Sequence, residues 1–229
     1  MAPDKYEQLY ALQDAVMHAV FSRQLGFYLT GGTALSRFYL HHRYSDDLDF
    51  FTHEINSFGD AVRTVRSDLE KLFTPVIADV DAREFKRFTV QEADLLLKVD
   101  FVADRAPRVG VPENRDGRYV DTVRNILSNK VGAVLSRDEI RDVADLLQIS
   151  RSYRFSWTAV LREALEKQQF EREELVYRLS TFPARSLRDL PYCGAAPDVQ
   201  DAETRILTIA RDIESGRDNS LAGAHAPEL

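Results

Sequence analysis

The segment Phe27–Thr52, FYLTGGTALSRFYLHHRYSDDLDFFT, decides the fold of this chain. Its pattern predicts a short apolar strand, a glycine turn, a helix over residues 34–40, a loop and a second strand that starts at Asp47. Successive side chains of a strand point to opposite faces, so Asp47 and Asp49 share one face while Leu48 faces a core. The segment therefore predicts two neighbouring carboxylates on one face of a sheet.

Two neighbouring carboxylates repel each other, and a divalent cation bound between them removes the repulsion. Carboxylate oxygens are suitable ligands for Mg²⁺, whose coordination shell is commonly completed by water and substrate phosphates. Gly31 and Gly32 would let the backbone approach a phosphate closely, and Thr33 would cap a helix whose first amides favour an anion. Together these features predict a nucleotide–Mg²⁺ site, although each one alone also occurs as an ordinary turn or a solvated strand face.

A third carboxylate lies in the apolar segment 94–102, DLLLKVDFV. This segment predicts a buried strand with Asp100 near its end. An acidic residue there costs free energy unless something pairs with it. A metal shared with Asp47 and Asp49 would be such a partner if the two strands are neighbours, and an ordinary solvated strand end is the alternative.

The remaining patterns predict an α/β (α+β) fold with a mixed sheet, followed by a helical C-terminal region. A loop at 103–118, rich in Pro, Gly and Arg, is expected to join the two. We expect an α/β domain at 1–118, a helical domain at 119–216 and a disordered tail at 217–229. The expected helices are 5–24, 57–73, 121–135, 140–149, 157–169, 171–181 and 202–214, with further strands at 75–80 and, at the sheet edge, 84–91.

Composition bounds the class of protein. The 229 residues are 44% hydrophobic and 29% charged, as in ordinary globular proteins. No apolar run is long enough to span a membrane and no signal pattern begins the chain, so a cytoplasmic protein without membrane attachment is expected. The lone Cys193 excludes an internal disulfide. A net charge of −7 argues against a generally basic nucleic-acid-binding surface, although local basic patches remain.

Charged residues of the helical half form a second pattern. Asp142 and Asp145 are three residues apart and so share one helix face, where like charges are unfavourable unless compensated. Lys130 or an arginine could compensate them, and a salt-bridged helix surface would explain the same pattern. A separate set of basic residues would suit a polyanion, or would simply be solvated: Arg105, Arg108, Arg115, Arg118, Arg137, Arg141, Arg151 and Arg154.

Five segments together resemble the AbiEii/AbiGii-type nucleotidyltransferase toxins, which are members of the DNA polymerase β-like nucleotidyltransferase superfamily. The similarity extends from Phe27 to Leu147. Many relatives have no acidic residue at the position of Asp100. The matching segments are GGTAL (31–35), HRYSDDLDFF (42–51), LKVDFV (97–102), NKVGA (129–133) and RDVADL (141–146).

The resemblance implies a polymerase β-like core that transfers a nucleoside monophosphate from an NTP, with loss of pyrophosphate. It implies Mg²⁺ or Mn²⁺ bound by Asp47, Asp49 and Asp100. It also implies phosphate contacts by Gly31, Gly32, Thr33, Arg43 and Ser45, and catalytic roles for Asp47, Asp49, Lys130 and Asp142. For Arg43 an alternative is a structural ion pair with Asp46 or Asp142.

The resemblance further implies the toxin of a toxin–antitoxin (abortive infection) pair, with a cognate antitoxin as partner. The acceptor would be the 3′ end of tRNA or another RNA. Transfer to a protein or a small molecule is an alternative that the acidic net charge does not oppose. An inactive binding module is a third hypothesis, which the retained pair Asp47 and Asp49 disfavours.

Overall fold

The computed structural model describes residues 3–229, which divide into two compact units. This division differs from the single boundary predicted at residue 118, because residues 35–43 of the first half join the helical unit. The first unit comprises the chain up to Ala34, Tyr44–Arg105 and Val111–Asp121, and the second comprises Leu35–Arg43, Ala106–Gly110 and Thr122–Leu229.

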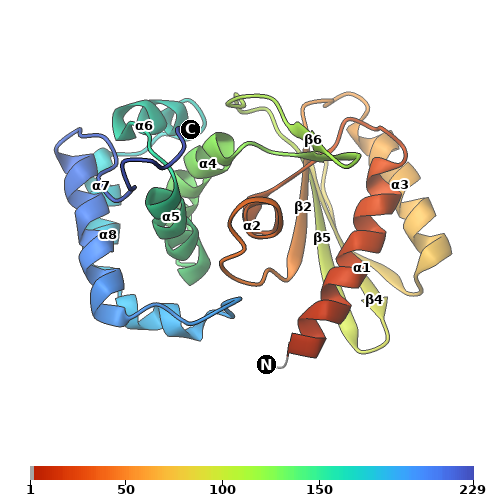
Figure 1. The fold of residues 1–229 in the computed structure, drawn as a ribbon. Coiled ribbons are helices and arrows are strands. Elements are labelled where there is room, and N and C mark those ends of the chain that lie inside the picture. The colour runs from red at the N-terminus through yellow and green to blue at the C-terminus, as the bar shows by residue number, and fades with distance from the viewer. Residues whose placement is uncertain (1–2) are drawn as a thin grey trace. The chain divides into compact units, whose positions relative to one another are not determined.

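The first unit contains a mixed sheet, which confirms the predicted α/β fold class (Figure 1). Its strands are β1 (Tyr28–Thr30), β2 (Asp47–Thr52), β3 (Val76–Asp81), β4 (Phe85–Glu92), β5 (Leu95–Ala103), β6 (Glu113–Arg115) and β7 (Arg118–Val120). Their order across the sheet is β3-β4-β5-β2-β1-β7-β6. The prediction of β4 as an edge strand is wrong, since β4 pairs with both β3 and β5 and the edge is β3.

The prediction that residues 103–118 form only a loop is also wrong. β6 and β7 are an antiparallel hairpin within and just beyond that segment, and β7 pairs with β1. Asp116 and Gly117 make its turn with φ of 53° and 81°. An Asp-Gly pair is a strong hairpin signal because both positions tolerate positive φ. The sequence therefore contained the signal for this hairpin.

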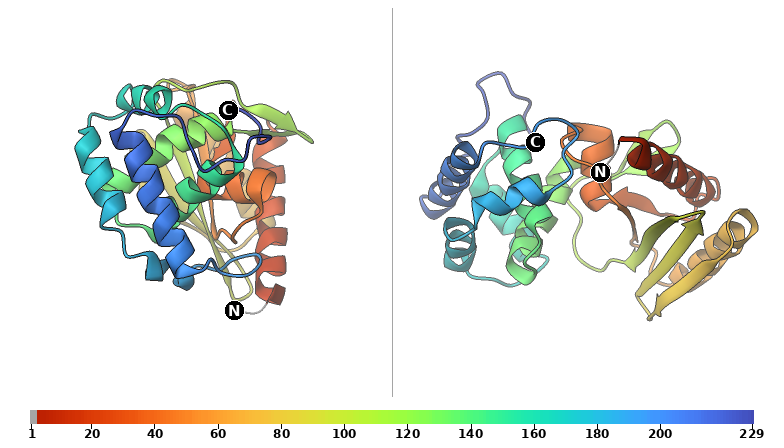
Figure 2. Two further views of the ribbon diagram at one scale, coloured as in Figure 1. Left: turned by 60° about the vertical axis from the view of Figure 1, so that its left-hand side comes forward. Right: turned by 90° about the horizontal axis from the view of Figure 1, so that it is seen from below.

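Helices α1 (Pro3–Phe21) and α3 (Phe58–Leu72) cover one face of the sheet. Phe21 of α1 packs edge-on against Phe50 of β2, and Phe50 stacks on Phe101 of β5. α3 lies against β3, as Figure 2 shows from below. Helix α1 ends at Phe21 rather than at the predicted residue 24, and Gln24 adopts a left-handed conformation after it. Leu48 and Phe50 of β2 thus lie on the buried face of the sheet, together with Val99 and Phe101 of β5, and the aspartates of both strands lie on the other face.

The second unit is helical, as predicted (Figures 1 and 2). Thr122 caps the first of its long helices by accepting a hydrogen bond from the Asn125 amide. Its elements are a π-helix (Ser36–Leu40), α4 (Val123–Ser136), α5 (Ile140–Ser152), α6 (Trp157–Leu165), α7 (Arg172–Ser180), a 3₁₀-helix (Ala184–Asp189) and α8 (Val199–Glu214). No helix among residues 3–229 is long and apolar enough to cross a membrane.

The predicted disorder of residues 217–229 is wrong. Asn219 is buried, and its side-chain amide donates to the carbonyls of Ser150 and Tyr153, each at 2.7 Å. These carbonyls lie at the end of α5, where the helix cannot satisfy them itself. Arg154 exchanges backbone hydrogen bonds with the last residues of the chain. A small polar composition suggested disorder, but these hydrogen bonds hold the segment in place.

Candidate active site

Three predicted carboxylates lie on one face of the sheet, in the first unit. β2 and β5 are parallel, with Asp49 directly beside Asp100 and Asp47 beside Lys98. The alternate residues Leu48 and Phe50 are fully buried on the opposite face. The predicted alternation of β2 is confirmed. The condition set for a role of Asp100, that its strand is a neighbour of β2, is also met.

A glycine turn holds the backbone against these carboxylates. Gly31 begins helix α2 (Gly31–Leu35) with φ +70°, and a Cβ at this position would collide with Asp49 Oδ2. The Thr33 hydroxyl donates to the Asp47 carbonyl rather than capping the helix. Ser45 Oγ donates to Asp47 Oδ1 at 3.4 Å. Gly31, Thr33 and Ser45 therefore fix the two carboxylates in position.

Gly31→Ala is expected to reduce activity roughly 100-fold, because the added methyl displaces Asp49 by about 1 Å. A left-handed alanine also costs roughly 1–2 kcal/mol of stability. Gly117→Ala is a matched control, since Gly117 has φ +81° but a Cβ there would meet nothing within 4 Å. Both variants should lose similar stability in denaturant titrations, and only Gly31→Ala should lose activity. Equal activity of the two variants would contradict this role for Gly31.

Asp100 is held by an arginine of the next strand. Arg87 of β4 lies directly opposite Asp100 in the antiparallel pair. Arg87 Nε donates to Asp100 Oδ1 at 2.7 Å and Nη2 donates to Oδ2 at 2.6 Å. Such a bidentate pair fixes the orientation of the carboxylate and compensates its negative charge. Asp100 therefore already has a cationic partner within the protein.

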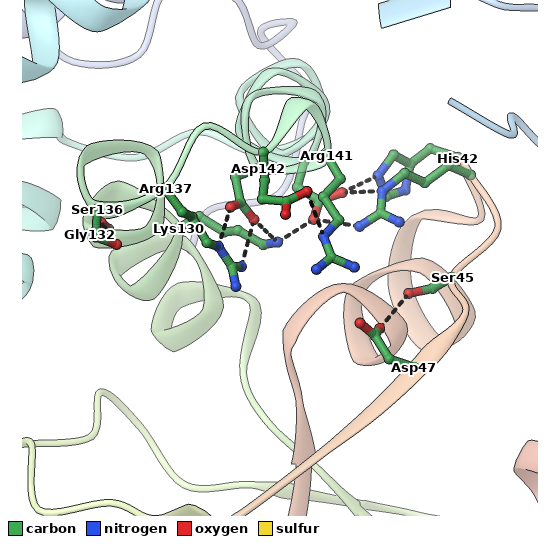
Figure 3. A network of polar contacts seen from close by, with 12 residues as sticks. His42, Ser45, Asp47, Lys130, Gly132, Ser136, Arg137, Arg141 and Asp142 are labelled. Atoms are coloured by element: carbon green, nitrogen blue, oxygen red, sulfur yellow. Dashed lines mark hydrogen bonds and ion pairs between the residues drawn. The ribbon is translucent and has the colours of Figure 1, made fainter. Parts of the chain in front are cut away.

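The second unit contains a buried ion cluster, drawn in Figure 3. Lys130 Nζ lies 2.7 Å from Asp142 Oδ1 and 2.6 Å from Asp145 Oδ2. Arg137 donates to both Asp142 oxygens, and Arg43 donates to both Asp145 oxygens. Both aspartates are 0% exposed. Three cations thus neutralise two fully buried carboxylates, with one positive charge in excess.

His42 adds one more contact to this cluster. Its Nε2 lies 2.9 Å from Asp145 Oδ1. Its Nδ1 is buried without a hydrogen-bond partner in the described part of the chain. The backbone around His42 is also tied down, because its carbonyl accepts from the Cys193 amide. The ring is therefore part of the packing around Asp145.

The cluster makes the two aspartates strongly acidic. Burial would raise the pKa of Asp142, but the charge of Lys130 and hydrogen bonds from Arg137 and Lys130 outweigh it and lower the pKa. The same balance, with Lys130 and Arg43 as cations, holds the pKa of Asp145 well below its usual range. Both carboxylates therefore remain ionised through the neutral and mildly acidic range.

A pH dependence of stability follows from these pKa values. Groups whose pKa is lower in the folded state stabilise it above their unfolded value of about 3.9, and this contribution is lost as pH falls below that value. The free energy of unfolding of the second unit should therefore drop below about pH 4. Carboxyl ¹³C titration of Asp142 and Asp145 is the direct measurement. Titration of either at or above the free value would contradict the cluster's electrostatics.

Comparison with known proteins shows the family to which the chain belongs. The family model described as nucleotidyl transferase AbiEii toxin, type IV TA system, matches residues 16–215. The chain belongs to this family. It is therefore a nucleotidyltransferase, as the resemblance had implied.

Individual proteins resemble the chain in sequence or in fold. The uncharacterised protein aq_aa25 of Aquifex aeolicus (strain VF5) is 30% identical over 174 residues, which cover 72% of this chain and 75% of that protein. The crystal structure of JHP933 from Helicobacter pylori aligns with TM-score 0.61 at 19% identity and covers 94% of each chain. A second H. pylori structure aligns with TM-score 0.59 at 19% identity, over 94% of this chain and 96% of that one. The structural likeness shows a shared fold.

Within this AbiEii-family chain, the predicted phosphate-binding residues separate into two groups. Gly31, Gly32, Thr33 and Ser45 surround the carboxylate face or the turn beside it. Arg43 belongs to the second unit, where it is 3% exposed and bound to Asp145. The structure therefore shows Arg43 in a structural ion pair, which was the alternative to phosphate binding. Its carboxylate partner is Asp145, which was not one of the two partners suggested.

Lys130 and Asp142 were predicted to be catalytic, but the structure places them in the buried cluster of the second unit. The Lys130 side chain is 6% exposed and its ammonium is bound by two carboxylates. These contacts are the compensation that the helix pattern predicted for Asp142 and Asp145. They give both residues a structural role, and catalysis by either stays a prediction.

The donor atoms of the first unit fit a divalent ion in part. Asp47 and Asp49 supply carboxylate oxygens on one face, next to a backbone without a Cβ at Gly31. Asp100 has both oxygens bound by Arg87. Among residues 3–229, no group of three or more His, Cys, Asp or Glu side chains is arranged to hold a metal. Asp47 and Asp49 are the residues that would hold the ion.

Arg87 and Lys98 are residues of this face that the sequence interpretation missed. Arg87 is opposite Asp100, and Lys98 is beside Asp47 on the neighbouring strand. The signal was present in β4, where Phe88 and Val90 are buried and Arg87 and Thr89 alternate with them. Because β4 was placed at the edge, its polar face was not assigned to the carboxylates.

Proposed function

We propose that this chain transfers a nucleoside monophosphate from an NTP to the 3′ end of an RNA such as tRNA, with Mg²⁺ or Mn²⁺ bound at Asp47 and Asp49. The main support for this metal site is that Asp47, Asp49 and Asp100 lie on one face of the sheet, with the Gly31 turn packed against Asp49. Oxygen ligands and a closely approaching backbone are what a triphosphate–metal substrate requires.

Each residue of the face has a separate task in this proposal. Asp47 and Asp49 bind the ion, and Ser45 holds Asp47 through its Oδ1. Gly31 leaves space for the Asp49 carboxylate because it has no Cβ. Gly32 also has no Cβ, so a phosphate could approach its backbone closely. When bound, the ion would neutralise charge on the transferred phosphoryl group and on the pyrophosphate that leaves.

The RNA acceptor has weaker support than the transfer itself. Several predicted polyanion contacts are paired with acidic residues of their own unit: Arg105 with Glu84, Arg115 with Glu113, and Arg118 with Asp14. Exposed ion pairs of this kind contribute little free energy, so a phosphate can displace the carboxylate. The same pairing favours the second candidate, transfer to a protein or small-molecule acceptor, because it lowers the positive charge offered to RNA.

A toxin that acts inside the cell needs restraint, and the family is described as one of toxin–antitoxin systems. We propose a cognate antitoxin as partner of this chain and the cytoplasm as its site of action. The sequence motifs that match the family and intact Asp47 and Asp49 support an active enzyme over an inactive binding module.

The acceptor can be tested with RNA whose 3′ end is chemically blocked. The protein is incubated with Mg²⁺, each α-labelled NTP in turn, and total tRNA that is either intact or periodate-oxidised at its terminal ribose. Label in intact but not in oxidised RNA is the expected result. Label in protein or in a small molecule, with both RNAs unlabelled, would replace the RNA acceptor by the second candidate.

A further inference from the structure

We propose that Arg87 takes the place of a second divalent cation beside Asp100, so that the carboxylate face binds one divalent ion in the absence of nucleotide. This inference rests on the proposed metal site at Asp47 and Asp49. It assigns Arg87 as a positioning residue that acts through Asp100. Neither the family motif nor the predicted site includes this residue.

The sheet register brings Arg87 and the three carboxylates into one patch, with Lys98 beside Asp47 at its margin. Arg87, Asp100 and Asp49 are directly paired neighbours on β4, β5 and β2. Asp47 is two residues before Asp49 on the same face. The hydrogen bond to Asp100, and then the charges of Asp100 and Asp49, raise the pKa of Arg87 above its ordinary value. Arg87 is therefore a permanent positive charge that interacts with two of the three carboxylates.

The carboxylates of this patch are then not equivalent. Arg87 binds both oxygens of Asp100, whereas Asp47 and Asp49 remain to bind one Mg²⁺ or Mn²⁺, and Lys98 beside Asp47 is exposed. Without Arg87, both oxygens of Asp100 would be released. Hard divalent cations bind such oxygens. Removal of Arg87 alone should therefore create a second binding site that contains Asp100.

The Arg87 side chain is also held where a metal would otherwise lie. Its planar fork matches the two oxygens of Asp100, which a point charge such as lysine cannot do. The guanidinium lies over the ring of Phe85, with 5.4 Å between its Cζ and the ring centroid. The Asp100 side chain is only 15% exposed, so few directions of approach remain open to a competing ion.

The test is the number of Mn²⁺ ions bound per chain, measured from the electron paramagnetic resonance signal of free Mn²⁺ without nucleotide. Wild type is expected to bind one ion and Arg87→Gln two. Arg87→Gln/Asp100→Asn should return to one, because the second site loses its carboxylate. Arg105→Gln is the matched control, since Arg105 also donates two hydrogen bonds to a carboxylate of this unit, that of Glu84, and it should bind one.

The outcomes separate this inference from the proposed function. If Arg87→Gln binds one ion, and Asp49→Asn abolishes that binding in wild type, the inference is overturned and the metal site stands. If wild type binds no ion, both are overturned. Asp100→Asn alone should retain one ion, because Asp100 is not its ligand. Loss of the ion in Asp100→Asn, or two ions in wild type, overturns the inference even when Arg87→Gln fails to fold.

Discussion

Asp49→Asn is expected to lower nucleotidyl transfer by at least about 1,000-fold, which corresponds to roughly 4 kcal/mol of transition-state stabilisation. Asparagine keeps the shape of the side chain and removes the charge that holds the divalent ion. The Gly31 turn still accommodates it, because an amide group is about as large as the carboxylate that it replaces. The loss should therefore appear in turnover and in metal binding rather than in folding.

The stability of Asp49→Asn should equal or exceed that of wild type without metal, since repulsion between Asp49 and its neighbours is reduced. Asp46→Asn is the matched control: Asp46 is exposed and precedes strand β2. It should keep full activity. Full turnover of Asp49→Asn, measured by steady-state kinetics over a range of Mg²⁺ concentrations, would remove Asp49 from the metal site.

Lys130→Met is expected to destabilise the second unit by roughly 3–5 kcal/mol, the usual cost of removing one partner from a buried ion pair. Lys130 neutralises both Asp142 and Asp145, neither of which is exposed to water. A catalytic role alone would lower activity without unfolding the chain. The buried cluster predicts a loss of stability as well.

Arg137→Met provides the control for Lys130→Met. Arg137 also binds Asp142, but its side chain is 50% exposed. Water can replace it, so we expect a loss of roughly 1 kcal/mol, as for exposed ion pairs. Urea titrations of both variants give the comparison. Unchanged stability of Lys130→Met together with lost activity would restore the catalytic assignment of Lys130.

Local periodicity was enough to predict the carboxylate face. The alternation in DLDFF is a property of any strand, so Asp47 and Asp49 followed directly from the sequence. The helical pattern of α5 likewise indicated that Asp142 and Asp145 need a cation on their face. These predictions succeeded because each depends on residues within a few positions of one another.

Contacts between distant segments were not predictable in the same way. Arg43 and Asp145 are 102 residues apart, and no local rule selects Asp145 over the two partners considered for Arg43. Arg87 pairs with Asp100 only because β4 lies inside the sheet, which depends on the pairing of β3 as well. The ordered tail likewise depends on carbonyls of Ser150 and Tyr153 that the sequence does not mark as acceptors.

The central claim is that this chain transfers the α-phosphoryl group of an NTP with its nucleoside, by means of Asp47 and Asp49. The most direct measurement compares α- and γ-labelled NTPs in otherwise identical reactions with Mg²⁺ and total tRNA, for wild type, Asp49→Asn and Asp46→Asn. Acceptor labelled from the α position, labelled pyrophosphate released from the γ position, and no labelled acceptor with Asp49→Asn are the predicted results. Acceptor labelled from the γ position, or labelled equally well by Asp49→Asn, would contradict the claim.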